Sequence, residues 1–266
     1  MEKKIRQFLG EANLIGSTLL YFDEIGSTNT FLKQLALEGA ADGTVVIADS
    51  QTAGRGRMQR SFQSPKGKGI YLSVLLRPDV SPERASCVTA LAGVAVCDAV
   101  EQTCGVRPGL KWPNDPVLGN RKLCGILTEL VMMPDGRPAV ILGIGLNVLQ
   151  REEDFLPEVR GIATSLAMEL GHSVEREALA AELIRRLERV YTALNSEDWS
   201  DWTHVYRRDC VHIGKKIRLI GPEQEETATA IDIDENFGLM VIGEDGRQRT
   251  VRTGEISVRG LFGYTE

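Results

Sequence analysis

The residues best suited to chemistry lie in one loop of the chain, from Gln51 to Lys68. The loop reads QTAGRGRMQRSFQSPKGK and contains no acidic residue, although the whole chain has a formal charge of -6. Like charges repel, and glycine loses more backbone freedom on ordering than any other residue. A bound anion would offset both costs, because arginine forks match phosphate oxygens and glycine lets backbone N–H groups approach closely. The loop is therefore either an anion-binding site or a solvated basic loop. Its basic side chains are Arg55, Arg57, Arg60, Lys66 and Lys68.

Two later segments carry complementary groups. KWPND offers a cation in Lys111, an amide in Asn114 and a carboxylate in Asp115. RKLCGI places Lys122 beside a strand that contains Gly125, where a ligand could approach the backbone closely. The alternative reading of Lys122 is a lysine that keeps a strand edge soluble.

Polar uncharged groups gather at a predicted helix start and at a strand end. Ser27, Thr28 and Asn29 precede the helical stretch TFLKQLALEGA, and all three are good N-cap residues. Capping explains one of them, whereas three adjacent hydroxyl and amide groups could bind a polar, uncharged ligand head. Asn147 ends the strand AVILGIGLNV and is either a turn residue or a ligand.

The surrounding pattern predicts the elements that position these groups. Strands GTVVIAD and GIYLSVLLRP flank the loop, and the second is apolar enough to be buried on both faces. A buried helix is predicted from Ser81 to Gly105, and Ser173 is predicted to cap an amphipathic helix. Four short strands follow from about Cys210, which suggests a separate small β-barrel. We therefore predict an α+β fold with domains at 1–209 and 210–266.

Composition excludes several classes of protein. No apolar run approaches the roughly 20 residues that span a bilayer, and no signal-peptide pattern is present. Five cysteines without a CxxC pair indicate a reducing cytoplasm, and three scattered histidines argue against a His-based metal site or triad. A pI near 5.3 argues against general nucleic-acid binding. There is no GxxxxGK[ST] or GxGxxG motif, so a P-loop and a dinucleotide fold are disfavoured.

Taken in order, GSTN, QTAGRGR, KWPND, RKLCGILTEL, GIGLNV and GEISVRG resemble the bacterial biotin protein ligases. The resemblance extends from about residue 20 to residue 262. It implies a mixed β-sheet flanked by helices, followed by a C-terminal SH3-like β-barrel. Lipoate ligases share the catalytic fold but not this set of motifs. The resemblance favours anion binding over a solvated loop for residues 51–68.

The family reaction has two steps, which the resemblance implies for this chain. Biotin and ATP give biotinyl-5′-AMP and pyrophosphate, with Mg²⁺ bridging the phosphates. The adenylate then acylates one lysine of a biotin carboxyl carrier protein, as on acetyl-CoA carboxylase. A lipoate or octanoate ligase and a non-catalytic biotin sensor are the alternatives, and intact Arg57 and Lys122 argue against a sensor.

The resemblance also implies residue roles. Arg57 and Lys122 match the catalytic positions. The biotin-binding positions are Ser27, Thr28, Asn29, Gln51, Arg55, Gly56, Arg57, Lys122 and Gly125. The ATP and adenylate positions are Arg57, Arg60, Lys111, Asn114 and Asn147. The metal positions are Asn147 and Asp115.

Three departures from the family pattern are visible. Met58 and Gln59 stand where many members have arginine and glycine, and Phe62 stands where tryptophan is frequent. About 20 residues precede the first predicted strand, which is too short for the winged helix-turn-helix of the bifunctional members. We therefore expect no specific DNA binding. Whether the protein is a monomer or a homodimer is left open by the sequence, as is the identity of the carrier protein.

Overall fold

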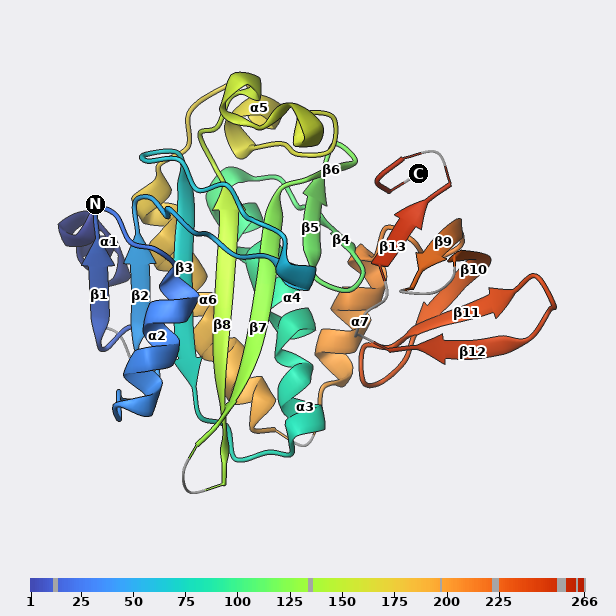
Figure 1. Cartoon of the computed structure of the whole chain (residues 1–266), viewed down its shortest axis with the longest axis horizontal. Helices are drawn as coiled ribbons and strands as arrows, with labels where there is room; N and C mark the ends of the chain where they lie inside the picture. Colours follow the sequence, from blue (N-terminus) through green and yellow to red (C-terminus); the bar gives the residue numbers. More distant parts are fainter. Residues whose placement is uncertain are drawn as a thin grey trace.

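A computed structural model describes residues 1–11, 14–133, 136–196, 198–221, 225–252, 257–261 and 263–265. It shows a large sheet with helices on both faces and a smaller sheet to one side (Figure 1). The large sheet has the order β1-β2-β3-β8-β7, and a short sheet β4-β5-β6 adjoins it. The strands are β1 Leu19–Phe22, β2 Val45–Ala48, β3 Gly69–Leu76, β4 Gly109–Lys111, β5 Asp115–Leu118, β6 Arg121–Lys122, β7 Cys124–Met132 and β8 Pro138–Asn147.

The large sheet is mixed, as predicted. β1 and β2 are parallel, whereas β2–β3, β3–β8 and β8–β7 are antiparallel. All eight residues of β3 are buried, which confirms the expectation from its continuous apolar run. The register places Ser73 opposite Gly143 and Gly125 opposite Gly145. Small residues therefore lie in two neighbouring rows on one face of the sheet.

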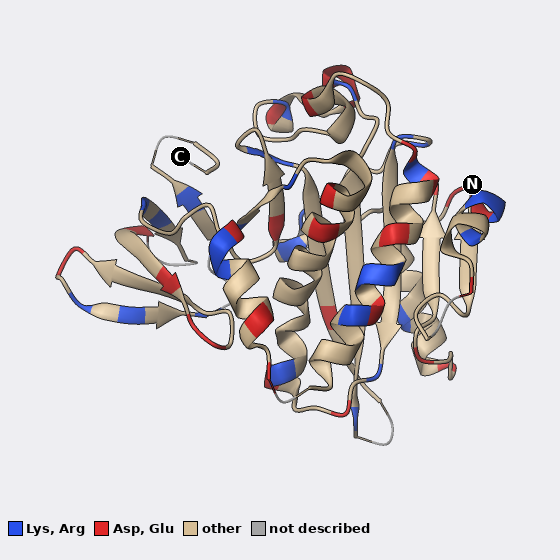
Figure 2. Ribbon diagram, turned by 180° about the vertical axis from the view of Figure 1, so that it is seen from behind, with Lys and Arg blue, Asp and Glu red and all other residues tan. Residues whose placement is uncertain are grey.

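Helices cover both faces of this sheet. α2 lies in front, over a small core that includes Leu32, Val46 and Ile141. α4 and α6 lie behind and pack on each other over the main core. Charged residues of both signs line the outward face of α6 (Figure 2), as expected for a helix half exposed to water, whereas the only charged residues of α4 are Asp98 and Glu101. The helices are α1 Glu2–Leu9, α2 Thr28–Leu37, η1 Arg57–Gln59, α3 Pro82–Ser86, α4 Val88–Cys104, η2 Glu152–Asp154, η3 Pro157–Val159, α5 Leu166–Leu170, α6 Arg176–Leu194 and α7 Ser200–Asp209.

The structure differs from the prediction at the boundaries of two helices. The helix predicted from Ser81 to Gly105 breaks at Cys87 into α3 and α4, although Ser81 does cap its start and Gly105 ends it with φ 70°. The segment Pro82–Cys104 is long and apolar enough to cross a membrane, but 61% of its most apolar window is buried inside the protein, as in a core helix. The prediction that Ser173 caps the amphipathic helix is wrong. α6 has Glu175 at its N-cap position and no side-chain cap.

The C-terminal sheet has the order β12-β11-β10-β9-β13, and every pairing is antiparallel. It contains five strands rather than the four predicted, because the last predicted strand divides into β12 and β13. This sheet is consistent with an SH3-like domain, and the boundary at residue 210 stays a prediction. Residues 254–256 of the GEISVRG motif lie outside the described residues. The strands are β9 Lys216–Ile220, β10 Glu225–Ile233, β11 Leu239–Gly243, β12 Gln248–Val251 and β13 Ser257–Gly260.

The two parts of the protein are joined by hydrogen bonds. The Trp112 indole donates to the carbonyl of Phe237 at 2.8 Å, and Arg207 Nη2 in α7 donates to the carbonyl of Ile233 at 2.6 Å. Within the larger part, Tyr206 of α7 donates to the carbonyl of Pro113 at 3.1 Å. The KWPND turn is thereby held against the C-terminal sheet, so that side chains from both parts can reach one site.

Candidate functional site

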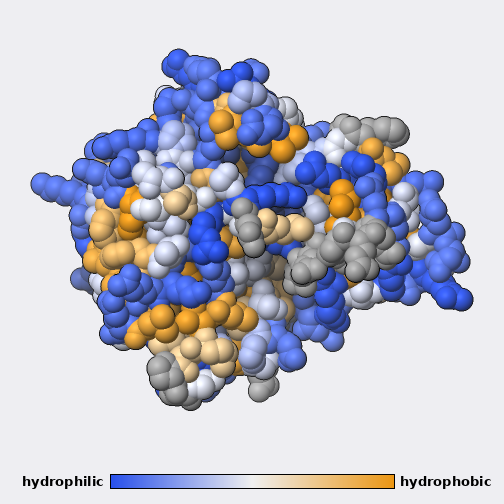
Figure 3. Space-filling model, viewed as in Figure 1, coloured by the Kyte–Doolittle hydropathy of each residue, from blue (hydrophilic) through white to orange (hydrophobic). Residues whose placement is uncertain are grey.

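A cavity of about 450 Å³ lies on the front face of the large sheet and reaches the C-terminal sheet. Hydrophilic and hydrophobic residues lie side by side around the centre of this face (Figure 3). The structure brings all the residues predicted for ligand binding, catalysis and metal binding to this one cavity. Those lining residues are Ser27, Thr28, Asn29, Gln51, Arg55, Gly56, Arg57, Arg60, Lys111, Asn114, Asp115, Lys122, Gly125 and Asn147. The role of each stays a prediction.

The basic loop folds back on itself as a small hairpin. The backbone N–H of Phe62 donates to the carbonyl of Gly54 at 2.9 Å, and that of Gly56 donates to the carbonyl of Arg60 at 2.7 Å. Met58 at the tip has φ 54°, a value that is unusual for a residue with a side chain. The hairpin crosses in front of β8 and β7 (Figure 1), so that it forms the outer wall of the cavity.

One end of the cavity is polar and uncharged. Ser27 caps α2, which leaves Thr28 and Asn29 buried in its first turn. Thr28 donates to Gln51 Oε1 through its backbone at 2.9 Å. Beneath them Ser73 on β3 is fully buried, and its Oγ lies 2.8 Å from Thr28 Oγ1 and 2.6 Å from Asn29 Oδ1. The capping interpretation thus accounts for Ser27, and the other groups line or support a polar recess.

Glu129 ties this polar end to the basic hairpin. Its carboxylate accepts a hydrogen bond from Asn29 Nδ2 at 3.0 Å and pairs with Arg55 Nη1 at 3.1 Å. Arg55 is half exposed, so the ion pair contributes little to stability. Its consequence is geometric, because it fixes one strand of the hairpin over β7.

The floor of the cavity depends on glycine. A Cβ atom on Gly143 would lie 2.1 Å from Asn29 Oδ1, and one on Gly145 would lie 2.5 Å from the ring of Phe62. Neither distance is possible for real atoms. Only glycine therefore fits at positions 143 and 145, where Asn29 and Phe62 contact the sheet. The ring of Phe62 thus lies directly against the sheet at Gly125 and Gly145, and it has no indole N–H to donate.

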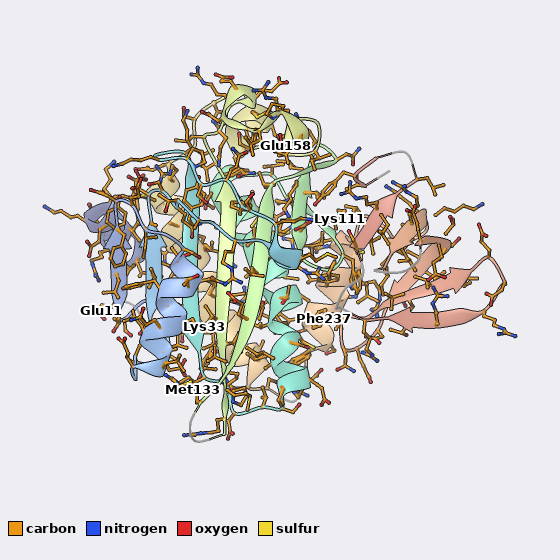
Figure 4. All side chains as sticks on the ribbon, in the orientation of Figure 1. Glu11, Lys33, Lys111, Met133, Glu158 and Phe237 are labelled. Carbon is orange, nitrogen blue, oxygen red and sulfur yellow. The ribbon has the colours of Figure 1, made fainter. Side chains whose placement is uncertain are left out.

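The other end of the cavity is cationic, with one carboxylate among several cations. Lys122 Nζ lies 2.7 Å from Asp115 Oδ1, and Lys111 lies with its Nζ 4.4 Å from the ring centroid of Tyr264. Figure 4 shows Lys111 where the catalytic part meets the C-terminal sheet. Arg57 Nη1 donates to Asn114 Oδ1 at 2.9 Å. Three cations thus share one carboxylate, and the site retains a positive charge that suits a polyanionic ligand.

The pKa values follow from burial and from these charges. Burial is the main reason that the pKa of Lys111 falls to about 8 and that of Arg57 falls below its ordinary value. Burial alone would raise the pKa of Asp115, but the charges of Lys122 and Lys111 outweigh it and hold that pKa below its usual range. Asp115 is therefore an ionised, buried counter-charge for the lysines.

The predicted metal ligands do not form a metal cage. Asp115 Oδ1 pairs with Lys122, and its Oδ2 accepts a hydrogen bond from Tyr264. Asn147 Oδ1 accepts from Gln150 at 3.0 Å. In the described part of the chain no three Asp, Glu, His or Cys residues cluster as a metal site would require. In nucleotide sites Mg²⁺ binds one or two side chains together with phosphates and water, so the metal role of Asp115 and Asn147 stays a prediction.

The sequence interpretation missed four residues of the site. Ser73 and Glu129 support the polar end, while Arg259 and Tyr264 line the cationic end from the C-terminal part. A serine inside the buried apolar run GIYLSVLLRP was a usable signal, because a buried hydroxyl needs a partner. No comparable signal marks Tyr264, since only the tertiary fold brings it to Asp115.

Comparison with known proteins agrees with this geometry. Residues 21–147 match the model of the biotin/lipoate A/B protein ligase family. The bifunctional ligase/repressor BirA of Bacillus spizizenii is 35% identical over 92% of this chain and 75% of its own. The biotin–[acetyl-CoA-carboxylase] ligase of Mycobacterium tuberculosis is 37% identical over 88% of this chain and 86% of its own. The Aquifex aeolicus biotin protein ligase, solved with biotin and ATP, superposes with a TM-score of 0.80 at 28% identity, covering 92% of this chain and 99% of that one. The chain therefore belongs to the biotin/lipoate A/B protein ligase family.

Proposed function

We propose that this protein is a biotin protein ligase, which activates biotin with ATP and transfers it to a lysine of a biotin carboxyl carrier protein. The observation that carries the proposal is the two-ended cavity. A buried, uncharged polar recess at Thr28, Asn29 and Gln51 suits the ureido head of biotin, and the cationic end suits ATP. The named relatives and the ATP-bound neighbour support the same reaction.

In the first step, an oxygen of the biotin carboxylate attacks the α-phosphorus of ATP, and pyrophosphate leaves as the phosphoanhydride bond breaks. Both reacting groups are anions, so their repulsion must be neutralised. Lys122 on β6 and Arg57 on the hairpin both line the cavity and would hold the carboxylate and the phosphate together. Lys111 adds charge at the phosphate end. Asp115 keeps the lysines from repelling one another before ATP binds.

In the second step, the amine of the carrier lysine attacks the acyl carbon of biotinyl-5′-AMP. An amide forms, and AMP leaves with the electrons of the broken acyl–oxygen bond. The acceptor we propose is the carrier domain of a biotin-dependent carboxylase such as acetyl-CoA carboxylase. The five cysteines are free, which fits the reducing cytoplasm where such carboxylases work.

The buried polar recess favours biotin over lipoate. The dithiolane ring of lipoate has no N–H or carbonyl group, so it offers no partner for the hydrogen-bonding capacity that Thr28 has to spare in this recess. A site built to hydrogen-bond a ligand rejects an analogue that lacks those groups by large factors.

Mass spectrometry of a carrier domain tests the proposal directly. The protein is incubated with the domain, ATP, Mg²⁺ and either biotin or lipoate. We expect one biotinyl group on one lysine and no lipoyl product. Transfer of lipoate alone would show a lipoate ligase. Adenylate binding with no transfer of either acid would show a sensor.

A further inference from the structure

Tyr264 belongs to the short segment that follows β13, yet its side chain lies in the cavity of the catalytic part. Its hydroxyl donates a hydrogen bond to Asp115 Oδ2. The next residue, Thr265, is buried and lies with its hydroxyl 3.4 Å from the carbonyl of Asn120. The segment is thus docked on the turn that joins β5 and β6, and the reaction described above gives Tyr264 no role.

The same ring contacts a second charged group. Lys111 Nζ lies 4.4 Å from the ring centroid of Tyr264, within the range of a cation–π interaction. The guanidinium carbon of Arg259 lies 5.9 Å from that centroid. One side chain therefore touches both the carboxylate and one of the lysines of the cationic end.

Asp115 connects Tyr264 to Lys122, because it interacts with both side chains. Its Oδ2 accepts from Tyr264 while its Oδ1 lies 2.7 Å from Lys122 Nζ. A carboxylate among several cations can turn toward any of them, because the attraction depends only on distance. A hydrogen bond to one oxygen removes that freedom. With Oδ2 held by Tyr264, Oδ1 remains for Lys122, and the lysine is directed to one place in the cavity.

Tyr264 is suited to act as a fixed donor. Burial, followed by the charge of Asp115, raises its pKa well above the ordinary value, so the hydroxyl keeps its proton at physiological pH. The charged groups that face this cluster are Lys111, Lys122, Arg57 and Arg259. All four are cations, so Asp115 stays ionised and accepts the hydrogen bond.

We propose that Tyr264 is a positioning residue for adenylation, acting through Asp115 on Lys122. The inference rests on the proposed function, because it assigns Lys122 to the reacting carboxylate. Through Tyr264, the C-terminal part of the protein would contribute to adenylation, separately from biotin recognition at Thr28 and Gln51. The polar end has no contact with Tyr264, so the hydroxyl should matter for turnover and not for biotin affinity.

Two substitutions separate the hydroxyl from the ring. Tyr264→Phe removes the hydrogen bond to Asp115 and keeps the ring against Lys111, whereas Tyr264→Leu removes both. Tyr21→Phe is the matched control, because the Tyr21 hydroxyl donates to Asp23 Oδ1 at 3.3 Å on β1, away from the cavity. The measurements are biotin-dependent ATP–pyrophosphate exchange, biotin affinity without ATP, and the pKa of the Asp115 carboxyl by NMR.

We expect Tyr264→Phe to lower kcat for exchange on the order of tenfold, which corresponds to one hydrogen bond to a charged group. Biotin affinity should stay within about twofold of wild type, since the polar end is untouched. The pKa of Asp115 should rise, because a donor to its ionised form is lost. Tyr264→Leu should also raise KM for ATP through the change at Lys111. Tyr21→Phe should change none of these quantities.

Wild-type kcat in Tyr264→Phe, or an unchanged Asp115 pKa, would overturn the inference. So would a loss of biotin affinity equal to the loss of kcat, which would mark Tyr264 as structural. Absence of exchange in the wild-type protein would instead refute the proposed function, while the NMR measurement would still decide whether Tyr264 controls Asp115.

Discussion

Ser73 and Asn29 form a buried hydrogen bond of 2.6 Å between a hydroxyl and an amide oxygen, and this bond orders the polar end of the cavity. The amide oxygen of Asn29 can only accept, so Ser73 must donate its single proton there. Thr28 Oγ1 lies 2.8 Å from Ser73 Oγ and 3.1 Å from Gln51 Oε1, so its one proton goes to one of these two acceptors. Gln51 Oε1 also accepts a hydrogen bond from the backbone N–H of Thr28. Thr28 Oγ1 keeps a spare lone pair, which suits an N–H group of a ureido ring.

Ser73→Ala should weaken biotin binding on the order of tenfold, although Ser73 does not line the cavity. The substitution leaves Asn29 Oδ1 without its donor and leaves the Thr28 hydroxyl with Gln51 Oε1 as its remaining partner. Titration calorimetry with biotin measures the effect. Ser86→Ala, at an exposed serine in α3, is the control and should bind biotin normally. Wild-type affinity in Ser73→Ala would show that the proton order of this network is irrelevant to binding.

Gly145→Ala should abolish tight biotin binding with little loss of fold stability. The new methyl group would lie 2.5 Å from the ring of Phe62 and would push the hairpin away from the sheet. Phe62 is on a loop, so the loop can move without disturbing the core. Biotin affinity and the thermal midpoint report the two effects separately. Gly161→Ala is the control, because a methyl group there meets nothing within 4 Å.

Replacing Phe62 as well gives a second check on that prediction. If the ring is the only obstacle, Gly145→Ala combined with Phe62→Leu should bind biotin better than Gly145→Ala alone. A double variant no better than the single one would mean that the methyl group itself occupies the space of the ligand.

Local patterns were enough to predict the main strands and helices, whereas the mixed sheet and the residues of the site were implied by the resemblance. The apolar run of β3 indicated burial, and the clustered charges of residues 51–68 left an anion site and a solvated loop as alternatives. The strand and helix assignments needed no family knowledge. The assembly of Lys111, Lys122 and Arg57 into one cavity rested on the resemblance, because nothing local places three distant segments together.

Other features could not be predicted because they depend on tertiary contacts. Glu175 and not Ser173 stands at the N-cap position of α6, and no side chain caps it, so capping chemistry does not decide where this helix begins. The resemblance implied a metal position for Asp115. Its surroundings of Lys122 and Tyr264 come from β6 and from the segment after β13, and they turn it into a counter-ion.

The depressed pKa of Lys111 predicts a stability change that depends on pH. Burial lowers this pKa from 10.5 to about 8, so the unfolded chain binds the proton more tightly. The charged lysine therefore destabilises the fold fully below pH 8, and the penalty is lost as pH rises from about 8 to 10.5. Lys111→Met should be more stable than wild type by up to about 3 kcal/mol at pH 7, and by much less at pH 10.

Urea unfolding of both proteins at the two pH values measures this difference. Lys216→Met, at an exposed lysine of β9, should show no comparable dependence on pH. Lys111→Met should also lose adenylation, because a cation at the phosphate end is gone. An equal stability difference at pH 7 and pH 10 would mean that Lys111 titrates normally in the folded protein.

Lys122→Ala should stop adenylation while the protein remains folded. The substitution removes the cation that faces the reacting carboxylate, and loss of one such group typically lowers kcat on the order of a hundredfold or more. The carboxylate of Asp115 is not left without a partner in this variant. The charge of Lys111 still stabilises it, and the hydroxyl of Tyr264 still donates a hydrogen bond to it. The fold should therefore survive, and circular dichroism should match wild type. Biotin-dependent pyrophosphate exchange measures the loss, and Lys216→Ala serves as the exposed control. Near-normal exchange in Lys122→Ala would remove Lys122 from the reaction and would leave Arg57 as the principal cation at the carboxylate.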